Sequence, residues 1–269
     1  MPELPEVETV VRTLERQIKD KEIKDVEVFW NNIIIGDVEK FKRTLIGKRF
    51  LSFNRLGKYI YFGLSDDLFL ISHLRMEGKY FLKKKEDIKE KHEHIIFHFS
   101  DETDLRYHDT RKFGKMELKK KAELFSTPPL SLLGPDANKL EFNDLKERFI
   151  HNNHKIKEVI LDQNVVAGIG NIYADEILFS CRVHPERLAS SLSDKEIKDF
   201  VKYSKQILDE AILAGGTTIR SYTSSLGVTG LFQQELLVHT KKECPICHSK
   251  ILTMKVGGRT SYYCPNCQK

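Results

Sequence analysis

The first hydrophobic pattern along the chain has the period of a helix. Apolar residues recur at spacings of three and four positions: Val7, Val10, Val11, Leu14 and Ile18. This spacing places their side chains on one face of a helix. Glu6 and Glu8 stand near the start, where the helix dipole favours negative charge. The pattern therefore predicts an amphipathic helix over residues 5–19.

From about residue 26 to about residue 118 the apolar runs are shorter and approach alternation with polar residues. Gly57, Gly78 and pairs of acidic residues separate the runs and predict turns. The runs predicted as strands are 50–53, 59–62, 68–71, 79–82 and 95–99. Many short strands with turns between them predict a β-sandwich or a barrel. The lysine- and glutamate-rich residues 83–91 are predicted to form a solvated loop.

A change of period follows the proline-rich residues 126–129 and the segment Gly134-Pro135-Asp136, which together are the best linker candidate. Beyond them the pattern is helical over residues 143–151, 155–163, 171–180 and 194–213. The last of these helices should begin with a capping box made by Ser193 and Glu196 and should end at Gly215-Gly216.

Composition limits the possible classes of protein. The chain has 269 residues, of which 40% are hydrophobic and 31% charged, so it is long enough for two or three modules and does not read as disordered. No run approaches the roughly 18 uninterrupted apolar residues of a membrane helix. The acidic, proline-containing N-terminus does not resemble a signal peptide. We expect a soluble, cytoplasmic protein with no membrane partner.

The clearest chemical motif is a pair of CxxC knuckles near the C-terminus. Cys244 and Cys247 are followed, after sixteen intervening residues, by Cys264 and Cys267. Four thiolates at this spacing predict one structural Zn²⁺ with no open coordination position. The alternative is two disulfides, which an intracellular protein disfavours. Cys181 stands alone and is predicted to be a buried small hydrophobe.

The charge of the chain is concentrated in the same segment. Residues 239–269 contain six basic residues and one acidic residue, so they carry the entire formal net charge of +5. Zinc bound by four thiolates would leave about +3, and a basic ribbon predicts a polyanion partner. Arg259 follows Gly257-Gly258 at a predicted hairpin tip. It is either an ordinary exposed residue or, as we expect, a phosphate contact.

The N-terminus offers a candidate nucleophile. Removal of Met1 would make Pro2 a free secondary amine, which can attack an electrophilic carbon and form a permanently cationic iminium ion. Glu3 and Glu6 are nearby carboxyl groups that could transfer protons. The alternative is a simple helix entry with Pro5 at the first helical position.

Several motifs together resemble the bacterial formamidopyrimidine-DNA glycosylase family, in family order over essentially the whole chain. They are PELPEVE at 2–8, LGKY at 56–59, SHLRM at 72–76, DTRKFG at 109–114, LDQ at 161–163, VAGIGNIYADE at 166–176, FQQ at 232–234 and the zinc tail. The resemblance implies a base-excision repair enzyme that removes oxidised purines, chiefly 8-oxoguanine and formamidopyrimidines, and then cuts the strand. The implied partner is double-stranded damaged DNA.

The resemblance also implies an α+β multidomain fold. It would comprise an N-terminal catalytic β-sandwich with a leading helix over residues 1–130, a helix-two-turns-helix domain over residues 136–238 and a zinc-finger hairpin over residues 239–269. We expect a monomer that associates with the bacterial nucleoid through DNA. A GxGN motif without a surrounding βαβ unit does not predict a nucleotide cofactor.

Carried over to this chain, the family pattern assigns catalytic roles. Pro2 is the nucleophile at C1′ of the damaged nucleotide, and Glu3 is the acid/base that assists sugar opening and base release. Lys58 matches the proton donor for β-elimination, and Arg259 matches the donor for δ-elimination.

Other positions match residues that bind DNA. Met76, Arg111 and Phe113 match residues that fill the space left by a flipped nucleotide, although a Met and a Phe near strand ends, taken alone, are usually core residues. The predicted phosphate contacts are His73, His94, Asn171 and Lys157. Asn171 has the alternative role of an ordinary N-cap. The segment 217–232 resembles the loop that closes over the flipped base, with candidate residues Thr217, Thr218, Arg220, Ser221 and Tyr222.

Two departures from the family pattern affect expected DNA affinity more than chemistry. Asn153 stands where members often carry a lysine, and residues 238–242 replace a common Tyr-Gly-Arg. Two other functions stay open at this point: an endonuclease VIII-like glycosylase for oxidised pyrimidines, and a zinc-ribbon DNA-binding protein without catalysis.

Overall fold

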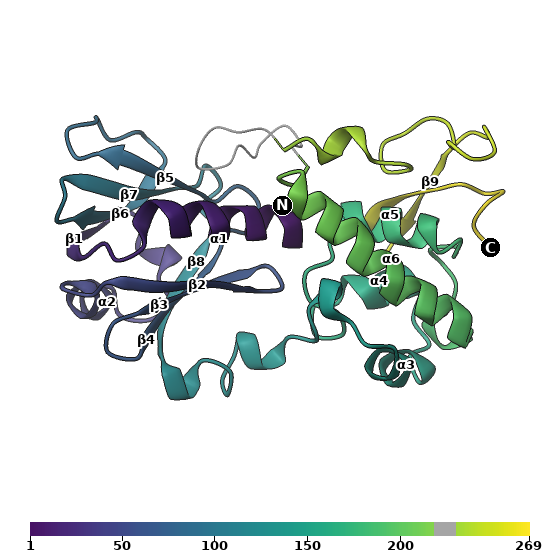
Figure 1. Cartoon of the computed structure of the whole chain (residues 1–269), viewed down its shortest axis with the longest axis horizontal. Coiled ribbons are helices and arrows are strands. Elements are labelled where there is room, and N and C mark those ends of the chain that lie inside the picture. Colours follow the sequence, from purple (N-terminus) through teal and green to yellow (C-terminus); the bar gives the residue numbers. More distant parts are fainter. Residues whose placement is uncertain (218–229) are drawn as a thin grey trace. The chain divides into compact units, whose positions relative to one another are not determined.

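The computed structural model of the chain describes residues 1–217 and 230–269 (Figure 1). Within these ranges the chain divides into two compact units. The first contains Met1–Pro2, Glu6–Leu132 and Gly230, and the second contains Glu3–Pro5, Leu133–Thr217 and Leu231–Lys269. The long segment of the first unit therefore ends between the two halves of the predicted linker.

The first unit is built around two four-stranded antiparallel sheets (Figure 1). One has the order β1 (Ile23–Val28), β6 (Glu93–Phe99), β7 (Thr103–His108), β5 (Lys79–Lys84). The other has the order β2 (Phe50–Leu56), β3 (Tyr59–Leu64), β4 (Leu68–His73), β8 (Lys115–Lys120). The ring of Phe50 lies 6.4 Å from that of Phe97 and 6.0 Å from that of Phe99, so side chains of the two sheets meet in one core. This confirms the predicted β-sandwich.

Two helices accompany the sandwich. α1 (Leu4–Ile18) confirms the predicted N-terminal helix, and Val7, Leu14 and Ile18 are buried in the sandwich core. α2 (Val38–Leu45) was not predicted, because only Phe41 and Leu45 are buried and two positions give no detectable period. Its N-cap is Asp37, whose side chain accepts a hydrogen bond from the Lys40 amide at 2.6 Å.

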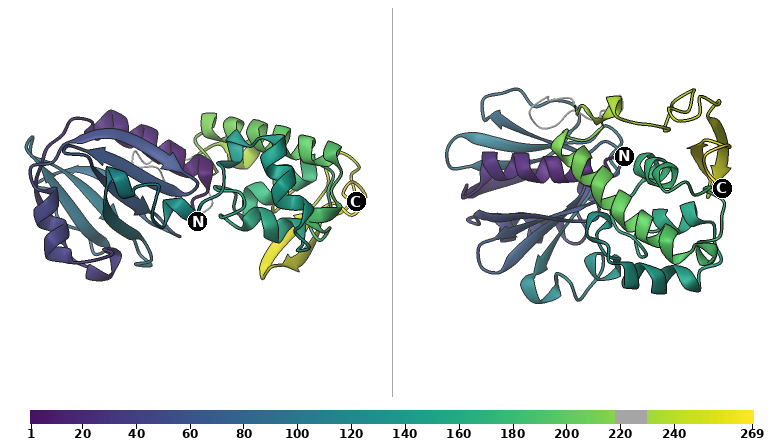
Figure 2. Two further views of the ribbon diagram at one scale, coloured as in Figure 1. Left: turned by 90° about the horizontal axis from the view of Figure 1, so that it is seen from below. Right: turned by 45° about the vertical axis from the view of Figure 1, so that its right-hand side comes forward.

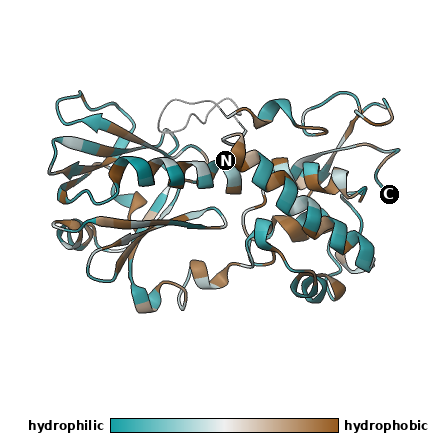
Figure 3. Ribbon diagram, viewed as in Figure 1, coloured by the Kyte–Doolittle hydropathy of each residue, from teal (hydrophilic) through white to brown (hydrophobic). Residues whose placement is uncertain are grey.

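Strands β1, β7 and β8 were also not identified individually. In β7 the buried positions include Asp104 and Arg106, so the strand lacks the apolar alternation that sequence reasoning needs. The predicted loop 83–91 is wrong at its start, since Lys83 is still within β5 and pairs with Glu93. Colouring by hydropathy shows apolar and polar segments interspersed along the strands (Figure 3).

A buried ionic network stabilises the β1-β6-β7-β5 sheet. Arg106 is 2% exposed, and its guanidinium lies 3.1 Å from a Glu93 oxygen and 3.0 Å from an Asp104 oxygen. The other Asp104 oxygen lies 2.7 Å from Nδ1 of His98, whose Nε2 is 2.8 Å from Glu27. Each buried charge is therefore paired, as burial requires.

The bridging position of His98 predicts that the stability of the first unit depends on pH. Burial lowers the pKa of His98, but hydrogen bonds and charge from Glu27 and Asp104 outweigh it, so the net pKa is raised. A raised pKa stabilises the fold fully below about pH 6.5, the unfolded value, and the gain disappears as pH rises through the folded value. Between about pH 6 and about pH 8, the Tm of the wild-type protein should fall by on the order of 2 °C more than the Tm of the His98→Gln variant. Equal losses in the two proteins would contradict this role.

The second unit is helical (Figure 2). It contains α3 (Phe142–Ile150), α4 (Ile156–Leu161), α5 (Asn171–Ser180) and α6 (Asp194–Leu213), as the helical periods predicted. The Ser193–Glu196 capping box is present at the start of α6. Gly215 and Gly216 follow its end with φ of +77° and +81°, which few other residues adopt readily. α5 is buried from Ile172 to Phe179 and forms the centre of this unit.

The C-terminal part of the second unit is a two-stranded hairpin beside the cysteines. β9 (Leu252–Val256) and β10 (Arg259–Tyr263) are joined by Gly257-Gly258, whose φ values of +55° and +73° confirm the predicted tip. Cys181 is buried as predicted, and burial raises the pKa of its thiol. Across residues 1–217 and 230–269, every helix is too short or too polar to span a bilayer.

Candidate functional site

Glu3 occupies the N-terminus of α5. One carboxylate oxygen accepts hydrogen bonds from the amides of Gly170 (2.7 Å) and Tyr173 (3.4 Å), and the other accepts one from Ile172 (3.0 Å). Amide donors and the positive end of the helix dipole stabilise negative charge. The sequence analysis predicted a phosphate contact at Asn171, and in the structure the anion at this helix end is the carboxylate of Glu3.

The glycines before α5 make room for the N-terminal segment. A Cβ on Gly170 would lie 2.3 Å from Cδ of Glu3, and one on Gly168 would lie 2.6 Å from a methyl carbon of Leu4. Gly168 also has a φ of +105°, and its carbonyl accepts the Leu4 amide at 3.1 Å. The GIGN motif is thus explained by close approach of residues 3 and 4.

Three of the other predicted catalytic residues, Pro2, Glu6 and Lys58, are also buried. Pro2 is buried, and Glu6 lies buried in the first turn of α1. Lys58 lies with Gly57 in the turn between β2 and β3. A lysine beside a turn is usually exposed, but Lys58 is 5% exposed. The Lys58 side chain is therefore held within the protein and does not extend into solvent.

The turn that carries Lys58 is held by a residue that sequence reasoning missed. Arg55 has its Nη1 3.1 Å from the Gly57 carbonyl and its Nε 3.0 Å from Glu8. Burial raises the pKa of Glu8, but Arg12 and Arg55 outweigh it and lower the pKa, so Glu8 stays ionised. Arg55 and Glu8 are 47 positions apart, and no local pattern signals such a pair.

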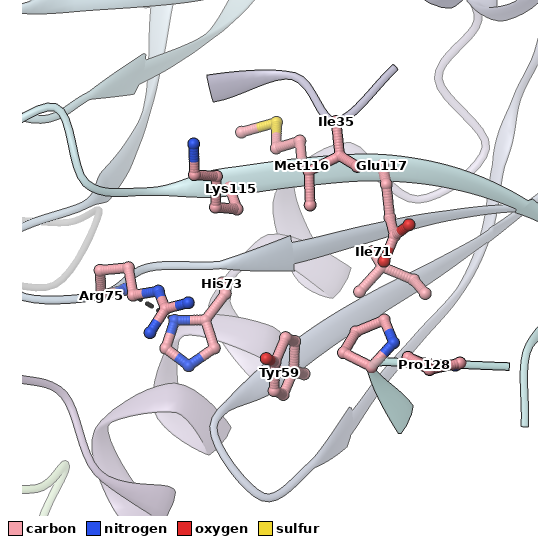
Figure 4. A pocket seen from close by; sticks show the side chains of 10 residues that line it. Ile35, Tyr59, Ile71, His73, Arg75, Lys115, Met116, Glu117 and Pro128 are labelled. Atoms are coloured by element: carbon pink, nitrogen blue, oxygen red, sulfur yellow. Dashed lines mark hydrogen bonds between the residues drawn. The ribbon is translucent and has the colours of Figure 1, made fainter. Parts of the chain in front are cut away.

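His73 lines a cavity of about 290 Å³ with Tyr59, Ile71 and Arg75 (Figure 4). Its Nδ1 accepts the Arg75 amide at 3.0 Å. Burial, then the charges of Arg75 and Lys58, lower the pKa of His73 to about 3. The ring is therefore neutral with its proton on Nε2, so a phosphate would receive an uncharged N–H.

Met76, Arg111 and Phe113 are presented to solvent. Met76 is 36% and Phe113 49% exposed, so the core alternative for these two residues is wrong. The guanidinium carbon of Arg111 lies 4.8 Å from the centre of the Phe113 ring, within cation–π range. Buried Asp109 shapes this loop by accepting the amides of Arg111 at 3.0 Å and Gly114 at 2.8 Å.

His94 is attached to the same loop. Its Nε2 lies 2.9 Å from the Asp109 carbonyl, so this nitrogen carries the proton. Burial lowers the pKa of His94 despite the Asp109 hydrogen bond, which leaves Nδ1 as an acceptor in the neutral ring. Phosphate binding by His94 in this arrangement requires protonation of Nδ1.

The structure corrects two interpretations in the second unit. Gly170, and not Asn171, is the N-cap of α5, and the Asn171 amide nitrogen donates to the Thr260 carbonyl at 2.9 Å. Lys157 has no exposed surface, and its ammonium lies 2.6 Å from Asp175 and 2.7 Å from Ser261. A fully buried and paired lysine does not support the predicted phosphate contact.

The remaining predicted DNA contacts are only partly within the described residues. Thr217 is described and buried. The other candidates of the base-recognition loop lie outside the described residues: Thr218, Arg220, Ser221 and Tyr222. Asn153, where family members often carry a lysine, accepts a hydrogen bond from Ser190 at 2.8 Å.

The four cysteines form a metal site. Their Sγ atoms all lie within 4.8 Å of one another, with Cys244–Cys267 at 3.8 Å and Cys247–Cys264 at 3.5 Å. A disulfide needs about 2.05 Å, whereas a Zn²⁺ tetrahedron with bonds of about 2.3 Å needs an S–S edge near 3.8 Å. The geometry therefore fits one structural zinc and not the disulfide alternative. Arg259 is exposed at the start of β10.

Comparisons with known proteins agree with this geometry. Three family models match consecutive parts of the chain: the formamidopyrimidine-DNA glycosylase N-terminal domain (residues 1–116), the H2TH domain of the same glycosylase (133–223) and a zinc finger found in FPG and IleRS (241–269).

Similar whole proteins carry the same name. Formamidopyrimidine-DNA glycosylase of Bacillus subtilis is 48% identical over 100% of this chain and 99% of its own length. That of Ligilactobacillus salivarius is 43% identical over 100% and 99%.

Two solved structures of Lactococcus lactis Fpg match with TM-scores of 0.94 and 39% identity. One is a complex with an abasic site containing DNA and covers 99% of each chain. The other is a complex with an N7-Benzyl-Fapy-dG containing DNA and covers 100% of each chain. By this agreement in sequence and in fold, the chain belongs to the formamidopyrimidine-DNA glycosylase family.

Proposed function

We propose that the protein is a bifunctional DNA glycosylase and AP lyase of base-excision repair that excises oxidised purines from double-stranded DNA. The observation that carries the proposal is the placement of Glu3, which directly follows Pro2 and has its carboxylate fixed by three amides at the N-terminal end of α5, those of the N-cap Gly170, Ile172 and Tyr173. The named relatives and the DNA complexes of the Lactococcus lactis protein support it.

In the proposed first step Pro2 acts as the nucleophile. Once Met1 is removed, the lone pair of the Pro2 nitrogen attacks C1′, and the damaged base leaves with the electron pair of its bond to C1′. Opening of the sugar ring gives an iminium ion, which keeps its positive charge because a secondary amine has no second N–H to lose. We assign the proton transfers of sugar opening and base release to the Glu3 carboxyl group, which directly follows Pro2 in the chain.

The strand is then cut by two eliminations. The iminium acidifies the C2′ proton, and its loss lets the C3′–O bond break with the electron pair going to the phosphate oxygen. Loss of the C4′ proton then forms a C4′=C5′ bond and releases the second phosphate from C5′. We assign donation to these leaving groups to Lys58 and Arg259 respectively, with Glu6 as an auxiliary proton-transfer group.

Access to C1′ requires the nucleotide to leave the stack, at a cost of a few kcal/mol. Met76, Arg111 and Phe113 suit the vacated space, because all three side chains are exposed, and Asp109 fixes the loop that carries Arg111 and Phe113. His73 supplies a neutral N–H that can donate to a phosphate. The Asn171 side chain donates one of its two N–H groups to the Thr260 carbonyl, so the second N–H can donate to a phosphate.

Replacement of Phe113 by alanine tests the wedge role. Because the ring is 49% exposed, we expect Tm to change by less than about 2 °C. Lost stacking of about 1–3 kcal/mol should slow base excision roughly tenfold. Single-turnover excision with Phe125→Ala as control measures this, since Phe125 is also an exposed aromatic residue of the first unit. Equal effects of the two substitutions would contradict the assignment.

The lesion class is tested by comparing two duplexes in one cleavage assay. We expect faster cleavage of 8-oxoguanine opposite cytosine than of thymine glycol opposite adenine. The reverse preference would favour the endonuclease VIII-like alternative. We further propose that the protein acts as a monomer on DNA in the bacterial cytoplasm. It should need no nucleotide cofactor, because Glu3 and Leu4 occupy the glycine loop.

A further inference from the structure

A buried polar cluster joins α4, α5 and β10 within the second unit. The Lys157 ammonium, with no exposed surface, lies 2.6 Å from Oδ1 of Asp175 and 2.7 Å from Oγ of Ser261. The other Asp175 oxygen lies 2.7 Å from Nδ1 of His239 and accepts the Tyr262 amide at 3.3 Å. An ion pair buried to this degree holds its partners in one geometry, because any displacement leaves a charge unpaired.

Strand β10 has a second connection to the start of α5. The Thr260 carbonyl accepts a hydrogen bond from the Asn171 side chain at 2.9 Å and lies 3.5 Å from the Lys157 ammonium. Asn171 is the first residue of α5, and the next amides of this helix hold Glu3. The residue before Thr260 is Arg259. One helix therefore positions both the Glu3 carboxylate and the backbone from which Arg259 extends.

The electrostatic environment of Lys157 is consistent with this central place. Burial lowers the pKa of Lys157. The negative charges of Asp175 and Glu3 raise this pKa, and the positive charge of Arg259 lowers it. Lys157 therefore lies within electrostatic reach of both Glu3 and Arg259.

Arg259 needs such support because its own surroundings are open. It follows Gly257-Gly258 at the exposed tip of the hairpin, and an arginine side chain has many rotamers. Within β10, Thr260 and Ser261 are the residues nearest to Arg259 that contact the helices.

We propose that Lys157 and Asp175 are positioning residues that fix Arg259 relative to Glu3 and thereby favour completion of the second elimination. The inference rests on the proposed function. In that step water takes the C4′ proton, the electron pair of the C4′–H bond forms the C4′=C5′ bond, and the C5′–O bond breaks with its electron pair on the phosphate oxygen. An N–H of Arg259 donates to that oxygen, and no oxidant or reductant is needed.

The test is the ratio of the two cleavage products in Asp175→Asn and Ser261→Ala. A strand cut only by β-elimination keeps an unsaturated sugar, whereas δ-elimination leaves a 3′ phosphate, and a denaturing gel separates the two. We expect the β-only fraction to rise at least about fivefold, since misplacement by about 1 Å can cost far more. The yield of borohydride-trapped adduct should stay within about twofold of wild type, because trapping does not need Arg259.

Asp209→Asn is the matched control, because Asp209 accepts a side-chain hydrogen bond from Asn138 and the pair does not involve β10. We expect its product ratio to equal that of wild type. An unchanged ratio in Ser261→Ala, or a parallel fall of adduct and both products in the variants, would overturn the inference. If Asp175→Asn does not fold, Ser261→Ala decides, since it keeps the ion pair. Absence of an adduct in the wild type would instead overturn the proposed function.

Discussion

Glu3→Gln is expected to slow base excision by at least about 100-fold. A carboxamide cannot transfer the proton, and its NH₂ group would face one of the amide donors of Gly170 and Ile172. Loss of this cap should also destabilise the fold by about 1 kcal/mol. Single-turnover excision of 8-oxoguanine and thermal unfolding measure the two effects separately.

Glu176→Gln is the matched control for this prediction. Glu176 is equally buried, and its carboxylate also accepts three backbone amides, those of Leu237, Val238 and His239. This substitution should cost similar stability but change excision by less than about threefold. If both variants lost activity to the same extent, Glu3 would be a capping residue only.

Loss of zinc should have the second large effect. The hairpin core is small and includes two of the ligands: Phe179, Val238, Cys244, Ile251 and Cys264. Structural zinc contributes on the order of 10 kcal/mol in small domains, so Cys247→Ser should lose the metal and unfold β9 and β10. DNA affinity should fall at least about tenfold, because unfolding of β9 and β10 removes Arg259 and the other basic side chains of the tail from their fixed positions.

Hydrogen exchange and zinc content check this result. Amides of β9 and β10 should lose protection, while those of the sandwich strands should keep it, because their core shares no residue with that of the hairpin. Cys181→Ser makes the same substitution at a buried position outside the cluster and should keep its zinc. Full DNA affinity in a zinc-free protein with an unfolded hairpin would contradict the role of the tail.

The predictable parts of the fold are those in which one local pattern is sufficient. α1 and α6 have regular hydrophobic periods and recognisable ends. The spacing of the four cysteines directly identifies the ligands of the zinc site. β7 has no such pattern, because Asp104 and Arg106 take core positions that become tolerable only when Glu93 and His98 are folded against them.

In the candidate site, too, some residues could be identified from local motifs, whereas others depend on partners far away in the sequence. Pro2, Glu3 and Lys58 stand in short contiguous motifs and could be identified by their resemblance to the family. Asp175 and Arg55 act through partners 18 and 47 positions away, which no local pattern shows. Lys157 was predicted to contact a phosphate, whereas a buried carboxylate pairs with it here.

The proposed function depends most directly on attack of the Pro2 nitrogen on C1′ of a damaged nucleotide. Borohydride added during reaction with 8-oxoguanine DNA would reduce the iminium and fix the protein on the strand. Mass spectrometry of the digested product should find the sugar remnant on a peptide that begins at Pro2. An adduct on a lysine, or no adduct from protein that lacks Met1, would contradict the account.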